Sequence, residues 1–201
     1  MPLGANKAAL LGMGGVSAAD VILISTTTLS GNSEVEFAAF SSDYSSLIWQ
    51  FVGLNPSAHD SDLTFQTRVS GGSYANATTT GAYRYFNRYD GNTNGLQYQT
   101  SYDAGNSTVQ IPMNWNVDDG TELAGSNNSG YFQLFNPTSS SLFKTFSSLQ
   151  DGGIAISGGG ACGYGSGGWV NTTTALEAIE FKFNDPTATM DAGKILYWGV
   201  I

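Results

Sequence analysis

The chain has 201 residues, of which 41% are hydrophobic and only 11% are charged. This length suits one domain with a real core, and the low charged fraction favours β-structure over helices. The net charge of −9 and the seven scattered Lys and Arg leave no basic stripe to follow a phosphate backbone, which argues against nucleic acid as a partner. No apolar stretch reaches the roughly 20 residues of a membrane span, which argues against membrane insertion.

Residues 1–20, MPLGANKAALLGMGGVSAAD, are apolar without amphipathic spacing. They fit a signal peptide poorly, because three glycines interrupt the apolar part and Lys7 is its single basic residue. Residues 7–11 could form about one helical turn, which is too short to be stable alone. We therefore expect a docking arm over 1–20 that binds other copies of the chain or neighbouring proteins, with contacts from Leu3, Ala8, Leu10, Leu11 and Met13.

From residue 21 onward the hydrophobic pattern has a period of two, which is typical of half-buried strands. Turn clusters rich in Gly, Asn and Ser separate the apolar runs. One helical turn is predicted at 175–178. The predicted strands are, in chain order, 21–25, 34–37, 47–54, 63–69, 83–89, 96–102, 108–112, 130–135, 143–149, 179–183 and 194–200.

This pattern predicts an all-β fold, an antiparallel β-sandwich of the jelly-roll-like kind, over residues 21–201 behind the short arm. The last strand is apolar on both faces, so we expect it to lie inside a sheet or to be covered on both sides. The lone Cys162 can form no internal disulfide.

Asp90, Asn92 and Asn94 match the first half of a calcium loop, D-x-N-x-N-G. Ser101 stands where the bidentate Glu of such a loop belongs, and strands rather than helices flank it. The same residues suit a hairpin turn, which is the interpretation we favour over a cation site.

No catalytic residue is predicted. His59 is the only histidine and lies in a predicted loop, while Asp118, Asp119 and Glu122 suggest a solvated acidic turn. The glycine-rich stretch 158–168 lacks the Gly-Lys-Ser/Thr ending of a phosphate-binding loop, which favours an irregular surface loop, with a loop fitted to a neighbouring subunit as the alternative. No basic residue adjoins Cys162 in the sequence to lower its pKa.

Several aromatic residues lie in or near predicted loops, among Asn, Asp and Gly. Such rings stack on sugars, and they are also common at protein interfaces. The candidates for contact with a host surface or a glycan are Tyr74, Tyr102, Tyr164 and Trp169.

Five segments together resemble small structural proteins encoded by marine tailed bacteriophages: MPLGANKAALLG, LTFQTRVSGGSYANATTTGAYRY, GYFQLFNPTSSSLFKTF, AIEFKF and AGKILYWGVI. The resemblance runs over nearly the whole chain and carries no catalytic residue. It implies a β-sandwich or jelly-roll core and a place on the virion exterior, as a tail fibre or knob, a capsid fibre or a decoration protein.

On this basis we expect a non-enzymatic virion protein without cofactor, assembled in the host cytoplasm. Its expected partners are its own copies, with a trimer preferred, other capsid or tail proteins, and a glycan of the host surface. The alternative is a soluble, lectin-like carbohydrate-binding module with aromatic loops as its site.

Overall fold

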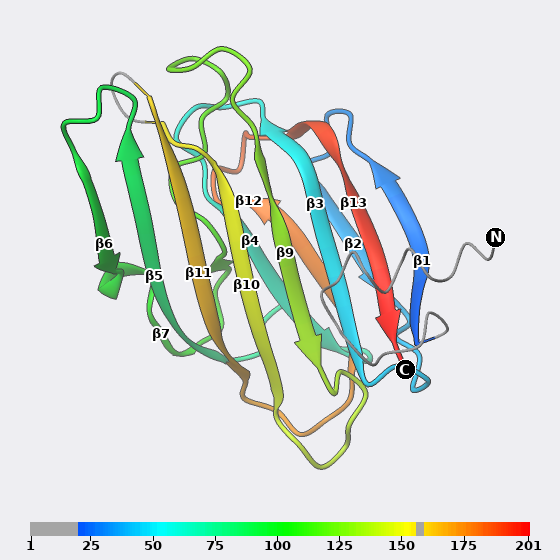
Figure 1. The fold of residues 1–201 in the computed structure, drawn as a ribbon. Helices are drawn as coiled ribbons and strands as arrows, with labels where there is room; N and C mark the ends of the chain where they lie inside the picture. Colours follow the sequence, from blue (N-terminus) through cyan, green and yellow to red (C-terminus); the bar gives the residue numbers. More distant parts are fainter. Residues whose placement is uncertain (1–19, 156–158) are drawn as a thin grey trace.

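The structure is a computed structural model, and it describes residues 20–155 and 159–201. Two antiparallel sheets lie face to face (Figure 1), so the all-β sandwich is confirmed. The chain passes repeatedly from one sheet to the other, as in a jelly roll. No helix within the described ranges is long and apolar enough to cross a membrane.

The larger sheet extends from the edge strand β1 to the edge strand β6, at opposite sides of Figure 1. The short β7 (Ala104–Ser107) also pairs with β5. The strand order of the larger sheet is β1 (Val21–Thr28), β13 (Met190–Val200), β3 (Ser46–Pro56), β9 (Asn128–Phe135), β10 (Lys144–Gly153), β11 (Gly160–Val170), β5 (Thr78–Arg88) and β6 (Asn94–Tyr98).

The smaller sheet packs behind the middle of the larger one (Figure 1). Its order is β2 (Glu34–Ala38), β12 (Leu176–Phe183), β4 (Leu63–Val69) and β8 (Ile111–Pro112). The strands predicted at 63–69 and 179–183 are confirmed as β4 and as part of β12. These two strands pair with each other in the centre of this sheet.

Trp49 lies at the centre of the core between the two sheets and is fully buried. Its indole stacks on the Tyr197 ring of the neighbouring strand at 5.1 Å, and Phe181 of the smaller sheet meets it edge-on at 5.7 Å. From Leu47 to Phe51 the side chains of β3 alternate, so that Leu47, Trp49 and Phe51 face the core and the residues between them face outward.

Beyond the smaller sheet, side chains from residues 99–127 cover the inner face of β11 and β5. The Arg84 guanidinium lies 3.5 Å from the centroid of the Trp115 ring, and Tyr102 packs edge-on against Tyr164. The buried Asp62 carboxylate accepts the Asn116 N–H at 2.7 Å and so ties this segment to the end of β4.

Three expectations are wrong. The strand predicted over 96–102 ends at Tyr98 with β6, and Thr100–Tyr102 form a short 3-10 helix instead. The stretch 158–168, predicted to be an irregular surface loop, forms the interior strand β11 from Gly160 onward, and its Gly163 and Gly165 make room for tyrosine rings of the next strand. Residues 175–178 form no helical turn, since Leu176 begins β12. The expectation for the last strand is confirmed, because β13 lies between β1 and β3.

Candidate functional site

The predicted docking residues Leu3, Ala8, Leu10, Leu11 and Met13 lie outside the described residues, and their role stays a prediction. The described chain starts at Asp20, directly before β1, so the predicted arm is joined to an edge of the larger sheet.

The four aromatic candidates occupy different environments. Tyr164 is buried at 1% exposure, so it has no ring face free for a ligand. Tyr102 is half-buried and donates its hydroxyl to Asp62 at 2.9 Å, while the half-buried Tyr74 lies under the Arg68 guanidinium. Trp169 differs from them, because it is 42% exposed on the outer face of β11.

Asp90, Asn92 and Asn94 lie at the hairpin between β5 and β6, as the turn interpretation predicts. The Asn92 N–H donates to the Asp90 carboxylate at 2.9 Å, and Gly91 takes the positive φ of 71° that the turn needs. This carboxylate therefore fixes the turn.

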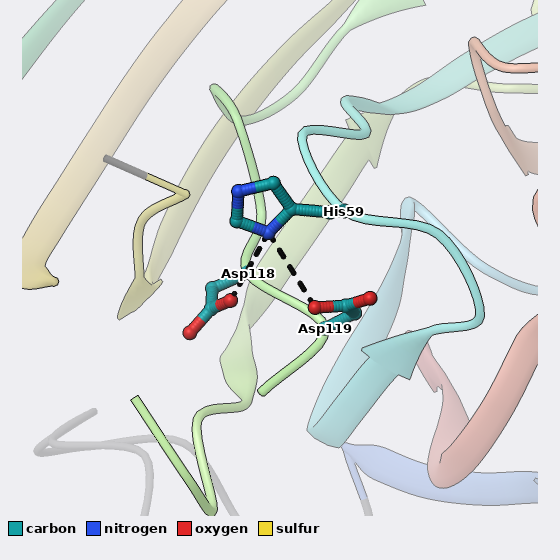
Figure 2. Close-up of side chains that lie close together, drawn as sticks. All are labelled: His59, Asp118 and Asp119. Carbon is teal, nitrogen blue, oxygen red and sulfur yellow. Dashed lines mark ion pairs between the residues drawn. The ribbon is translucent and has the colours of Figure 1, made fainter. Parts of the chain in front are cut away.

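His59 lies against two carboxylates that are far from it in sequence (Figure 2). Its Nδ1 is 3.3 Å from Asp118 Oδ1 and 3.4 Å from Asp119 Oδ1, and its Nε2 is 3.9 Å from Glu122 Oε1. The ligand atoms of His59, Asp118 and Asp119 lie within 4.8 Å of one another, so these three could hold a metal ion.

Asp118 is already engaged in local structure. Its two oxygens accept the backbone N–H groups of Gly120, Glu122 and Leu123 at 3.0–3.1 Å, and the side chain is fully buried. The prediction of a solvated acidic turn is therefore wrong for Asp118. With carboxylates facing both ring nitrogens, the cluster fits an ion pair that joins two loops when His59 is protonated.

Cys162 is buried on the inner face of β11, and burial raises the pKa of its thiol to about 11. The nearby Arg84 guanidinium acts in the opposite direction but is outweighed. The side chain is therefore a neutral thiol at neutral pH, which disfavours a nucleophilic role.

A pocket of about 330 Å³ lies at one end of the smaller sheet, and its lining includes Glu34, Gln110 and Lys182. The Lys182 ammonium pairs with the Glu180 carboxylate at 2.8 Å, which neutralises the positive charge that an anionic ligand would need.

The most distinctive surface is the outer face, the side of the larger sheet that points away from the smaller one (Figure 1). Among its paired strand positions only Asp151 and Lys194 carry charges. It has two parts. The aliphatic edge comprises Leu23 of β1 and Val52 of β3, next to the exposed Ile22 and Ile24 of the same edge strand β1, and the tyrosine platform comprises Tyr83, Tyr85, Tyr98 and Trp169.

The platform residues Tyr83, Tyr85 and Tyr98 were not among the residues predicted to bind a ligand. The sequence does carry a pattern for this surface. Aromatic residues alternate at 83 and 85, glycines alternate at 163, 165 and 167, and strand pairing places the two runs opposite each other. Two such runs nearly 80 residues apart form one surface only once β5 and β11 are known to be neighbours.

The chain was compared with protein families, curated proteins and solved structures. No family model matches the chain, and no curated protein or solved structure gives a significant match.

Proposed function

We propose that the chain is a non-enzymatic structural protein on the exterior of a tailed-phage virion, as a tail fibre or knob, a capsid fibre or a decoration protein. It acts as a homo-oligomer, with a trimer preferred, and binds other virion proteins through its N-terminal arm. The resemblance of its segments to marine phage structural proteins supports the virion location.

The observation that carries the assembly role is the free edge of β1. Among the described residues no strand pairs with its outer side. Ile22, Leu23 and Ile24 follow one another there and are 38–40% exposed. A long edge strand with exposed aliphatic side chains is a template for pairing with another chain, and monomeric proteins usually block it with charge or Pro.

The chemistry of the interior supports a non-enzymatic role. The Cys162 thiol is neutral and buried, and the Asp118 carboxylate is occupied by backbone N–H groups. His59 faces carboxylates rather than a hydroxyl or thiol nucleophile. A nucleophilic centre of the Ser-His-Asp or Cys-His type would need these groups in a different arrangement.

Antibody labelling of purified phage particles tests the location. An antibody raised against residues 21–201 is expected to decorate intact particles in electron micrographs. Labelling that is absent, or that appears only after the particles are disrupted, would contradict the proposal.

The alternative of a carbohydrate-binding module is favoured by one specific observation, the tyrosine platform.

A further inference from the structure

We propose that the tyrosine platform on β5, β6 and β11 binds a neutral glycan by stacking sugar rings on Tyr83 and Tyr85. For the proposed virion protein, the ligand on the host surface is then a neutral glycan. It does not depend on where the protein is anchored, so the two proposals fail independently.

The position of Tyr85 follows from the strand register. Tyr85, Gly163 and Asp151 lie directly opposite one another on β5, β11 and β10. The Tyr85 hydroxyl donates to the Asp151 carboxylate, two strands away. To reach it, the side chain must extend along the sheet, across the backbone of β11 at Gly163.

Tyr83 precedes Tyr85 by two residues on β5 and so lies on the same face of the sheet. It is placed in the same way, opposite Gly165 of β11. A Cβ at either glycine would stand closer than 3.0 Å to the tyrosine ring above it. Each ring therefore rests on bare strand backbone. The exposed fractions of 46% for Tyr83 and 45% for Tyr85 show that the opposite side of each ring is in solvent.

Neighbouring residues extend the platform. Tyr98 lies opposite Tyr83, is 64% exposed, and donates its hydroxyl to Asp103 at 2.7 Å. Next to Gly165 on the same face of β11, Gly167 pairs with Gly81, over which the Tyr98 hydroxyl lies, and Trp169 is the following residue of this face. Aromatic rings thus lie on both sides of the bare backbone at Gly167.

The chemistry of this surface matches a sugar. The C–H face of a pyranose packs on an aromatic ring, and rings already held in place lose little side-chain entropy on binding. The Asp151 and Asp103 carboxylates can accept hydrogen bonds from sugar hydroxyls. Because the charged groups at the platform are acidic and the chain has a net charge of −9, a neutral glycan fits better than an anionic one.

The test is binding of the purified full-length protein to an array of neutral oligosaccharides, followed by titration calorimetry with the best one. Tyr83→Ala removes a ring, whereas Gly165→Ala keeps the ring but displaces it. Both are expected to weaken binding at least about tenfold. Tyr83→Phe keeps the stacking surface and is expected to bind like the wild type.

Tyr89→Ala is the matched control, because it removes a 77% exposed tyrosine just beyond β5 that is not part of the platform. Its affinity is expected to stay within about twofold of the wild type. Thermal unfolding of each variant verifies the fold. The proposal is overturned if no neutral glycan binds, or if binding survives in both Tyr83→Ala and Gly165→Ala.

Discussion

At the residue scale, the chain uses several polar groups to hold loops rather than to do chemistry. Asp62 is the clearest case, because its buried carboxylate accepts hydrogen bonds from Asn116, Tyr102 and Asn184. Burial raises the pKa of this carboxyl above its usual value near 3.8, and the hydrogen bonds oppose that shift without cancelling it.

This shift predicts a pH dependence of stability. The folded chain holds the Asp62 proton more tightly than the unfolded chain does. The resulting stabilisation is complete below about pH 3.8 and is lost as the pH rises through the higher pKa of the folded state. Asp62→Asn removes this contribution while preserving an acceptor for the Asn116 N–H.

Urea unfolding at a series of pH values measures it. The free energy of unfolding of the wild type minus that of Asp62→Asn is expected to fall as the pH rises from about 3.8. Carboxyls with lowered pKa, such as those of Asp119 and Asp185, act in the opposite direction but are common to both proteins. A difference independent of pH would contradict a raised pKa at Asp62.

The His59 cluster yields a paired prediction. The His59 side chain is 34% exposed, so His59→Ala should lower the free energy of unfolding by less than about 1 kcal/mol. Asp118→Ala removes the acceptor of three backbone N–H groups and should lower the free energy of unfolding by about 2–3 kcal/mol. Denaturant titrations at pH 7 measure both. Equal effects would mean that the ion pair, and not the turn, holds this region.

At the scale of the element, β1 is the strand on which assembly depends. Lysine on an edge strand opposes pairing with another chain, because its charge would have to be buried. Leu23→Lys and Ile24→Lys are therefore expected to shift the protein toward monomer in light scattering. Val109→Lys is the control, since it places the same charge at a 68% exposed site away from this edge. An unchanged mass in the β1 variants would exclude this edge as the contact.

The strands show how far sequence reasoning reaches. Period-two alternation was sufficient for β4 and β12, because apolar and polar side chains alternate locally along each strand, although both faces of these strands are largely buried. It failed for β11, whose Gly163 and Gly165 look like a loop until Tyr85 and Tyr83 are known to lie over them. The strand character of this segment is thus set by its neighbour in the sheet and not by its own composition.

The His59 cluster was out of reach for a related reason. His59 and Asp118 are brought together by an isolated bridge between Ser61 and Val117, in a part of the chain without regular strands. No periodic pattern specifies such a bridge. The interpretation of an exposed histidine and a solvated turn treated each loop by itself, whereas the fold packs one against the other.

At the scale of the whole molecule, the outer face divides the proposed functions between its two ends. The aliphatic edge lies on β1 and β3, beside the point where the predicted arm joins the sheet. The tyrosine platform lies at the opposite end, on β5, β6 and β11. A molecule anchored by β1 and the arm would therefore present the platform away from its attachment.

Deletion of residues 1–20 tests the role of the arm. The truncated protein is expected to keep the sandwich, because both sheets and their core are built from residues 21–201. It is expected to lose attachment to particles, measured by immunoblotting of purified virions. Circular dichroism verifies that the β-structure remains. Incorporation at the wild-type level would contradict a docking arm.

The native mass of the purified full-length protein tests the central claim, that this chain is an assembly component, most directly. Light scattering coupled to size exclusion, at protein concentrations from micromolar upward, should give a closed oligomer, with a trimer preferred, whose mass does not change on dilution over this range. A monomer of 21.1 kDa across the whole range would contradict self-assembly through the β1 edge.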